Sequence, residues 1–202
     1  MQYKSPILAS GSPFRRAILV AAGVVVEIVV PQIDESFHKA DLERASPRPS
    51  PGSIALKLAE LKALDVLERH PGRCVIGSDQ VLAFDGEIFS KPQSIAAARQ
   101  QLRRLRGRSH ELLTAVVVAE DGKTLWTHMS RARLTMRDFS DAFLEDYLER
   151  QGDRVTATVG AYEIEGLGSQ LFGSIEGDHF TIVGLPLLPL MDELRNRRFL
   201  KT

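Results

Sequence analysis

The sequence contains a single cysteine, Cys74, one tryptophan and three tyrosines among its 202 residues. One cysteine excludes an intrachain disulfide, which favours the reducing cytoplasm. The N-terminus also lacks the basic region, apolar core and small-residue cleavage site of a secretory signal. The longest apolar run, residues 20–30, is interrupted by Glu27 and is shorter than the about 20 residues that a membrane helix needs. We therefore expect a cytoplasmic protein with no membrane partner.

No sign of charge is in excess either, because 26 Lys and Arg residues balance 26 Asp and Glu residues. A protein that coats nucleic acid through bulk positive charge is not expected, so any anion site must be local. Hydrophobic residues make up 44% of the chain, enough for a buried core. The length fits one domain over residues 1–202, built as a single body or as two lobes that share a central cleft.

Several familiar catalytic motifs are missing. There is no Gly-x4-Gly-Lys-Ser/Thr phosphate loop, no His-Glu-x2-His zinc helix, no Cys-x2-Cys pair and no Gly-x-Ser-x-Gly elbow. The five histidines, at positions 38, 70, 110, 128 and 179, share no ligand spacing. A transition-metal centre is therefore not expected, and a hard cation held by carboxylates and phosphates is the better option.

The remaining pattern alternates strands and helices. Cap residues and apolar periodicity predict helices over residues 13–22, 51–69, 94–106, 140–150 and 187–197. β-Branched and apolar runs predict strands at 6–10, 24–30 and 155–162, a strand pair or bent strand interrupted at 77–79, and hairpin turns at 85–86 and 122. Residues 31–50 read as a long polar loop. This alternation predicts an α/β fold with a mixed sheet.

The stretch "LASGSPFRRAIL" places two arginines at the start of a helix, directly after a Ser/Gly/Ser turn. Free backbone N–H groups, the positive end of the helix dipole, the Ser10 and Ser12 hydroxyls and the guanidinium groups of Arg15 and Arg16 could together bind phosphate. The alternative is a capped surface helix with two solvated arginines. The stretch alone does not decide between them.

Carboxylates and lysines offer further candidates. Asp79 lies where an apolar strand opens into polar residues, a position that suits a metal ligand or a group that activates water, or simply a strand end. Asp34 and Glu35 follow another apolar run and fit either a divalent cation site or a salt-bridged loop. Lys62 and Lys91 are single lysines, and Pro92 fixes the backbone next to Lys91.

Seven blocks occur in a fixed order: "LASGSPFRRAIL", "IDES", "LAELKA", "VIGSDQVLAFDGEIFSKP", "SHELLTAVVV", "GAYEIEGLGSQLF" and "IEGDHFTIVGLPL". With them the chain resembles the Maf family of nucleoside triphosphate pyrophosphatases from about residue 6 to residue 190. The resemblance implies an elongated mixed α/β sheet with two lobes around a cleft, similar to the inosine triphosphate pyrophosphatases. It also implies hydrolysis between the α and β phosphates with Mg²⁺ or Mn²⁺, and a possible homodimer.

The resemblance assigns roles at matching positions. It implies that Asp79 accepts the proton of the attacking water and that Glu35 and Asp79 hold the metal, although the two carboxylates could exchange roles. The resemblance also implies that Ser10, Arg15 and Arg16 bind the phosphates. It implies that Lys62 and Lys91 are catalytic lysines. The positive side chains would neutralise a triphosphate that carries about four negative charges.

Three further positions resemble the branch of the family that hydrolyses 7-methyl-GTP: Phe14, Gln80 and Glu165. An ionised Glu165 offers only acceptors and matches the donor edge of guanine. Phe14 can stack on a base whose N7-methyl group leaves a positive charge. Gln80 can donate and accept, so it fits either kind of base.

Two alternatives to this function remain. One is a dTTP/UTP pyrophosphatase, because parts of the later blocks are closer to the pyrimidine branch. The other is a non-catalytic, nucleotide-sensing regulator of cell division and septum formation. A nucleic-acid partner is the least expected, given the balanced charge.

Overall fold

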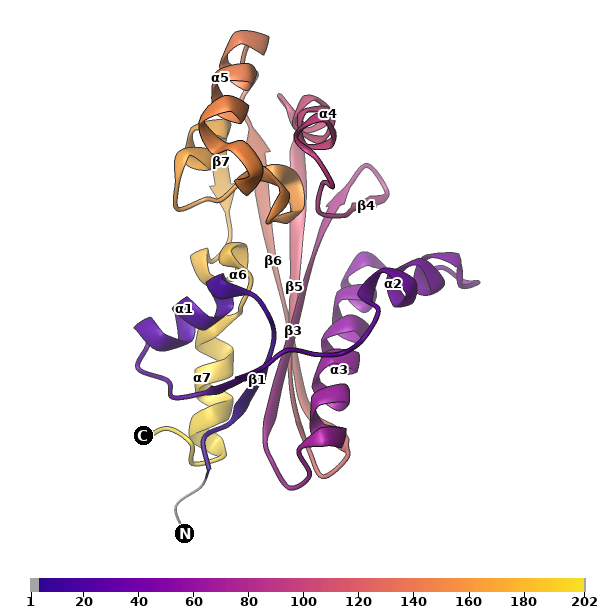
Figure 1. The fold of residues 1–202 in the computed structure, drawn as a ribbon, viewed down its shortest axis with the longest axis vertical. Coiled ribbons are helices and arrows are strands. Elements are labelled where there is room, and N and C mark those ends of the chain that lie inside the picture. The colour runs from indigo at the N-terminus through magenta and orange to yellow at the C-terminus, as the bar shows by residue number, and fades with distance from the viewer. Residues whose placement is uncertain (1–3, 202) are drawn as a thin grey trace. The chain divides into compact units, whose positions relative to one another are not determined.

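The computed structural model describes residues 4–201, so the ends of the predicted domain, residues 1–3 and 202, lie outside the described residues. Its strands, labelled in Figure 1, are β1 (Ile7–Ala9), β2 (Glu27–Val29), β3 (Val75–Phe84), β4 (Glu87–Phe89), β5 (Ser109–Glu120), β6 (Lys123–Met136) and β7 (Phe172–Glu176). Its α-helices are α1 (Pro13–Ala21), α2 (Glu35–Arg44), α3 (Pro51–Arg69), α4 (Ile95–Leu105), α5 (Asp141–Gln151), α6 (His179–Val183) and α7 (Leu187–Asn196). Three short 3₁₀ helices, η1 (Gly152–Thr156), η2 (Val159–Ala161) and η3 (Leu167–Leu171), lie between α5 and β7 in the sequence.

The strands form one mixed sheet in the order β2-β1-β3-β5-β6-β7, and β4 pairs with β3. Strand β1 runs parallel to both β2 and β3, whereas the β3–β4 and β6–β7 pairs are antiparallel. The predicted α/β class with a mixed sheet is therefore confirmed. The chain divides into two compact units, of which the second comprises Val81–Leu112 and Arg131–Asp178 and the first comprises the rest. The predicted cleft between two lobes stays a prediction.

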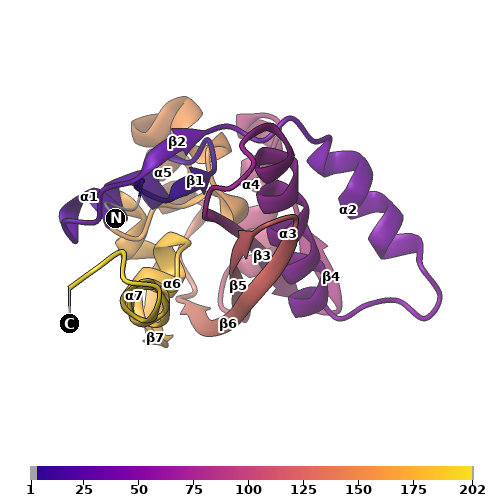
Figure 2. The same ribbon diagram turned by 90° about the horizontal axis from the view of Figure 1, so that it is seen from below.

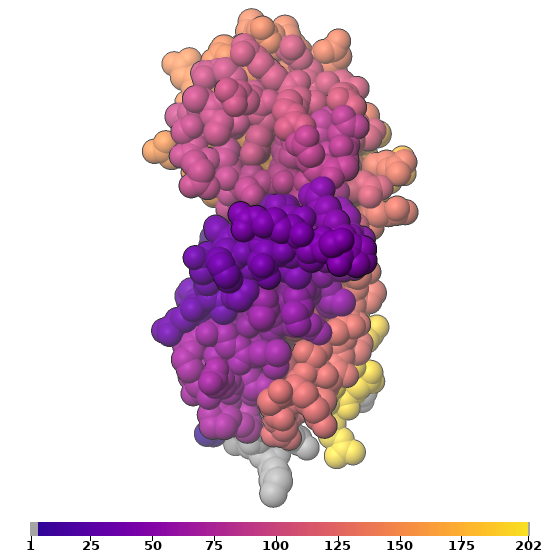
Figure 3. Space-filling model, turned by 90° about the vertical axis from the view of Figure 1, so that its right-hand side faces the viewer, coloured from indigo at the N-terminus to yellow at the C-terminus, as the bar shows by residue number. Residues whose placement is uncertain are grey.

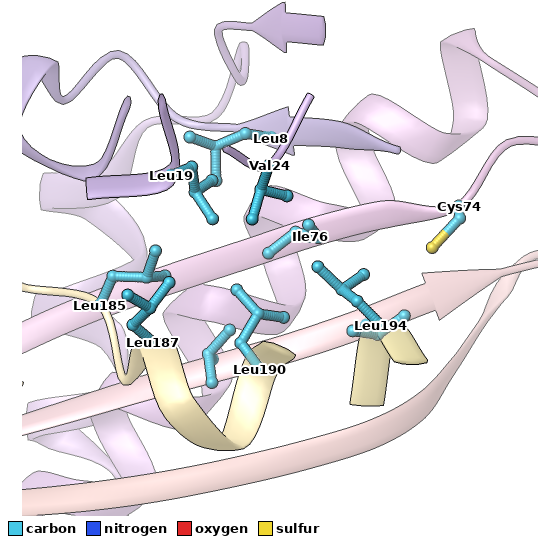
Figure 4. Packing of buried hydrophobic residues seen from close by; sticks show 11 residues of the cluster. Leu8, Leu19, Val24, Cys74, Ile76, Leu185, Leu187, Leu190 and Leu194 are labelled. Carbon is cyan, nitrogen blue, oxygen red and sulfur yellow. The ribbon is translucent and has the colours of Figure 1, made fainter. Parts of the chain in front are cut away.

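In the first unit, helices cover both faces of the strands. Leu8, Ile76, Val116 and Val118 turn to one face, where they pack with Leu19 of α1 and with the leucines of α7 (Figure 4). Gly77 turns to the other face and meets α3. Side chains of a strand alternate between its two faces, so each strand contributes to both layers. Figures 1 and 2 show α7 and α3 on opposite sides of β3 and β5.

In the second unit, α4 and α5 pack with η1 and η2. Leu102 and Leu105 of α4 and Leu144 and Tyr147 of α5 are buried. The hydroxyl of Tyr147 donates a 2.9 Å hydrogen bond to the carbonyl of Ala161, which ties α5 to the end of η2. Within residues 4–201, no helix combines the length and the apolar character that crossing a membrane requires.

Three predicted elements are wrong. The predicted loop at 31–50 contains α2, which begins at the N-cap Asp34 but buries none of its residues and lies at the surface in Figure 3. Its three apolar residues, Phe37, Ala40 and Leu42, do not form one continuous apolar stripe, so no helical periodicity reveals it. The predicted interruption at 77–79 is absent, because β3 is one buried strand through those residues. The predicted strand at 155–162 is replaced by the short helices η1 and η2, and the positive φ angles of Gly160 (80°) and Ala161 (62°) are incompatible with a strand there.

Candidate active site

The turn between β1 and α1 is organised by hydroxyl groups. Ser12 is the N-cap of α1, and its Oγ accepts the backbone N–H of Arg15 at 3.4 Å, while Pro13 occupies the first turn. The buried Ser10 accepts two donors at its Oγ, the backbone N–H of Ser12 at 3.1 Å and Nη1 of Arg15 at 3.3 Å. Two of the predicted phosphate-binding residues, Ser10 and Arg15, thus hydrogen bond to each other.

The two adjacent arginines differ. Arg15 is half-buried, and its Nε donates a 2.8 Å hydrogen bond to the carbonyl of Gly184. Burial lowers the pKa of the Arg15 guanidinium, and the negative charges of Asp79 and Glu35 oppose this shift. Arg16 is exposed. The alternative of a surface helix with solvated arginines therefore holds for Arg16. It does not hold for Arg15, which is fixed close to two carboxylates.

Close packing of α3 on β3 brings Lys62 to Asp79. A Cβ atom at Gly77 would lie 2.2 Å from the carbonyl oxygen of Ala59 and 2.9 Å from the Cβ of Ala63, so only glycine fits. Ala59, Lys62 and Ala63 share one helix face, because residues three and four apart lie side by side. Gly77 and Asp79 share one strand face by the same kind of periodicity. The contact that requires glycine thus places Lys62 opposite Asp79.

The buried ammonium group of Lys62 joins two carboxylates. Its Nζ lies 2.6 Å from Oδ1 of Asp79 and 2.7 Å from Oε2 of Glu35. Asp79 is buried, whereas the Glu35 side chain, on the first residue of α2, is 55% exposed. Burial raises the pKa of Asp79, the charge of Glu35 adds to the rise, and Lys62 and Arg15 oppose it. A carboxylate with a raised pKa beside two cations is a candidate for proton transfer.

The predicted metal ligands, Glu35 and Asp79, fit a hard divalent cation by their chemistry. Both offer carboxylate oxygens within hydrogen-bond distance of the same Lys62 nitrogen, so the two oxygens converge. Across residues 4–201, no group of three or more His, Cys, Asp or Glu side chains is arranged to hold a metal. Mg²⁺ is usually held by one or two carboxylates together with substrate phosphates and water. The two carboxylates thus fit a cation that arrives with a phosphate ligand.

Of the predicted base-specificity residues, two lie in the first unit. Phe14 is half-buried in the first turn of α1. Gln80 directly follows Asp79, and its Nε2 lies 2.9 Å from Oγ1 of Thr114, 2.9 Å from the carbonyl of Thr181 and 3.2 Å from that of Ile182. The prediction allowed the Gln80 amide both to donate to a base and to accept from it, and these contacts use its donor end.

Lys91 and Glu165 belong to the second unit. Lys91 is exposed and lies two residues beyond β4, before the buried Pro92. Glu165 is exposed and lies between η2 and η3. Their assigned roles stay predictions.

Several residues of this region were missed by the sequence reasoning. Ser78 and Thr114 are fully buried and hydrogen bond to backbone carbonyls. Lys39 follows Glu35 by one turn of α2, and burial lowers the pKa of Lys39 while Glu43 and Asp79 oppose the shift. The i, i+4 spacing of Glu35 and Lys39 was the available signal, but it requires knowing that α2 is a helix.

The chain is similar in sequence to a known protein family and to named enzymes of that family. A family model described as Maf-like protein matches residues 5–197. The 7-methyl-GTP pyrophosphatase of Brucella abortus biovar 1 (strain 9-941) is 50% identical, covering 95% of this chain and 96% of that protein. The 7-methyl-GTP pyrophosphatase of Mesorhizobium japonicum is 51% identical, with 94% of each covered. The nucleoside triphosphate pyrophosphatase of Rhodospirillum rubrum is 53% identical, covering 94% of this chain and 93% of that protein.

A solved structure of a nucleoside-triphosphatase / dITP/XTP pyrophosphatase from Mycobacterium abscessus was also found. It aligns with a TM-score of 0.42 and 17% identity, over 96% of this chain and 95% of that chain. A likeness of this degree carries no argument about the site.

Proposed function

The chain belongs to the family of Maf-like proteins, and we propose that it is a nucleoside triphosphate pyrophosphatase. The observation that carries the proposal is the Lys62 ammonium, which holds the buried Asp79 and the exposed Glu35 together at 2.6 and 2.7 Å. Relatives at 50 to 53% identity over nearly the whole chain bear the names of such enzymes.

The proposed reaction breaks the bond between the α-phosphorus and the oxygen that bridges to the β-phosphate. Asp79 accepts a proton from water as the water oxygen attacks phosphorus, and the bridging oxygen leaves with the diphosphate. Lys62 holds Oδ1 of Asp79, so it orients the carboxylate and opposes the rise of its pKa that burial causes. The products are a nucleoside monophosphate and diphosphate.

The positive groups have a separate task. Arg15, held by Ser10 and the Gly184 carbonyl, is proposed to bind phosphate oxygens, and Arg16 and Lys91 are proposed to add charge. A Mg²⁺ or Mn²⁺ ion on Glu35 and Asp79 would supply further charge neutralisation to the triphosphate. A non-catalytic nucleotide sensor would need cations but no buried carboxylate held beside them, so the hydrolase is the better reading.

For the base, we propose 7-methylguanine or a related modified guanine. The names of the similar relatives divide between 7-methyl-GTP pyrophosphatase and the unspecified nucleoside triphosphate pyrophosphatase. The support is chemical: a carboxylate at Glu165 accepts hydrogen bonds from the guanine N1–H and NH2 groups, and it attracts the positive charge of the methylated ring. Thymine or uracil would present a carbonyl to that carboxylate and be repelled.

The experiment that tests the function is a panel of standard and modified nucleoside triphosphates, incubated with Mg²⁺, with Mn²⁺ and with a chelator. Pyrophosphate and orthophosphate are measured separately. We expect pyrophosphate in metal-dependent amounts, highest with 7-methyl-GTP. If dTTP and UTP yield more pyrophosphate than 7-methyl-GTP, the result supports the alternative of a dTTP/UTP pyrophosphatase. If no nucleotide yields pyrophosphate, the result supports the alternative of a non-catalytic, nucleotide-sensing regulator.

Glu165→Gln tests the base assignment. Replacing the carboxylate with an amide introduces a donor where guanine also donates, so kcat/KM for 7-methyl-GTP should fall by about 10- to 100-fold, while dTTP and UTP are spared. Glu163→Gln is the control, because it removes a charge from the same loop, where Glu163 pairs with Arg154. An unchanged base preference in Glu165→Gln contradicts the assignment.

A further inference from the structure

The residues that flank Asp79 on β3 both turn to the end of α6. Ser78 is fully buried, and its Oγ lies 2.8 Å from the carbonyl oxygen of Ala115 and 3.2 Å from that of Gly184, so the two carbonyls share its single proton. Gln80 reaches the carbonyls of Thr181 and Ile182 through Nε2. All of these residues belong to the first unit.

The chemistry of the contacts fixes the orientation of the Gln80 amide. Thr114 Oγ1 donates its single proton to the Thr181 carbonyl at 3.0 Å, so toward Gln80 it acts as an acceptor. Carbonyl oxygens accept and never donate, so only the NH2 end of the amide can face them. Both hydrogens of Nε2 are therefore committed inside the protein.

The contacted carbonyls are those that a helix leaves without partners at its C-terminal end. The backbone of α6 closes at Gly184, whose N–H bonds to the Phe180 carbonyl at 3.0 Å and whose φ is 114°. The Gly184 carbonyl then accepts from Nε of Arg15 at 2.8 Å as well as from Ser78. One carbonyl thus joins the phosphate-binding arginine to the strand that carries Asp79.

We propose that Ser78, Gln80 and Thr114 form a clasp on the end of α6 that positions the Arg15 guanidinium through the Gly184 carbonyl. The clasp makes Gln80 a positioning residue rather than a reader of the base through its amide donors. Ser78 and Thr114 are positioning residues by the same logic, because both are fully buried and cannot touch a nucleotide. The proposal rests on the proposed function, in which Arg15 binds phosphate.

The test compares Thr114→Val, which is nearly isosteric but lacks the hydroxyl, with Thr114→Ser, which keeps it. Gln80→Leu removes the amide. With 7-methyl-GTP and Mg²⁺, Thr114→Val and Gln80→Leu should each lower kcat by about tenfold with a smaller change in KM, the size expected for one lost hydrogen bond. The double variant should lose less than the product of the two effects, because both belong to one chain of hydrogen bonds. Thr114→Ser should retain the wild-type kcat.

A second readout needs no activity. Hydrogen exchange of the Gly184 and Leu185 amides, both bonded to the Phe180 carbonyl, should be about tenfold faster in Thr114→Val than in Thr114→Ser. If the wild type releases no pyrophosphate, the proposed function fails, and the exchange data still decide whether the clasp exists. If Gln80→Leu does not fold, the comparison of Thr114→Val with Thr114→Ser still tests the proposal.

Two results overturn the proposal. The first is a change of base preference in Gln80→Leu with Thr114→Val unaffected, which would make Gln80 a direct base contact. The second is wild-type kcat and wild-type exchange in Thr114→Val, which would leave the Thr114 hydroxyl without a positioning role.

Discussion

At the scale of single residues, burial decides which ionisable groups differ from their ordinary behaviour. Asp79 and Lys62 form a buried ion pair, and breaking such a pair by removing one partner leaves an uncompensated charge. The Glu35 side chain contacts the same Lys62 nitrogen but is exposed to solvent, so it can exchange this contact for one with a cation or a nucleotide. One buried and one exposed carboxylate on a single ammonium fit the proposed roles, in which Asp79 accepts the proton and both carboxylates hold the cation.

His110 in the second unit shows the effect of burial without an opposing charge. It is 2% exposed, its Nε2 lies 2.7 Å from the Tyr162 hydroxyl, and its Nδ1 has no hydrogen-bond partner. Burial lowers the pKa of His110 to about 4. The neutral ring is thus part of the folded core.

This shift predicts a dependence of stability on pH. Below pH 6.5 the unfolded chain takes up a proton at position 110 before the folded chain does, so the free energy of unfolding should fall as pH drops from about 6.5 to about 4, by roughly 3 kcal/mol in total. Urea unfolding of wild type and His110→Gln across this range measures it. The glutamine variant should lose this part of the slope.

Tyr162→Phe is the control for the cause. It removes the hydrogen bond of His110 but leaves the ring buried, so it should lower stability at every pH and keep the slope. A wild-type slope in His110→Gln would show that His110 is not responsible.

At the scale of elements, the approach of α3 to β3 at Gly77 sets the site. Gly77→Ala would place a methyl group 2.2 Å from the Ala59 carbonyl, so helix and strand must separate. We expect destabilisation of about 3 kcal/mol and, in the molecules that still fold, a lower turnover because Lys62 moves away from Asp79. Chemical denaturation and activity per folded molecule measure the two effects.

Gly52→Ala is the matched control, because it adds the same methyl group to α3 itself. There the new Cβ meets the Met129 side chain at 3.7 Å and the Ser50 Oγ at 4.0 Å, both ordinary contacts. It should leave stability and activity near wild type. Equal behaviour of the two alanine variants would contradict the role given to the Gly77 contact.

The same elements show what sequence can and cannot predict. Helix α3 was predicted to the residue, since Ser50, Pro51 and an apolar repeat mark it. The resemblance also named Lys62 and Asp79, which the structure brings together. Helix α2 was missed for lack of an apolar face, and the contacts of Gln80 with α6 were missed because they join residues about 100 positions apart. Local patterns reveal elements, whereas such long-range hydrogen bonds depend on tertiary structure.

At the scale of the whole molecule, the candidate residues divide between the two compact units. Eight lie in the first: Ser10, Phe14, Arg15, Arg16, Glu35, Lys62, Asp79 and Gln80. Lys91 and Glu165 lie in the second. The first unit thus holds the groups proposed for proton transfer and metal binding. The cytoplasmic location and the homodimer stay predictions, and sedimentation of the purified protein would test the latter.

The most direct test of the central claim is the hydrolysis of 7-methyl-GTP with Mg²⁺, followed by ³¹P NMR for wild type and Asp79→Asn. The wild type should yield 7-methyl-GMP and pyrophosphate without orthophosphate. Asp79→Asn should still bind the nucleotide but lose at least about 100-fold in rate, because the amide cannot accept the proton. Release of orthophosphate with a nucleoside diphosphate, or a wild-type rate in Asp79→Asn, would contradict the proposed reaction.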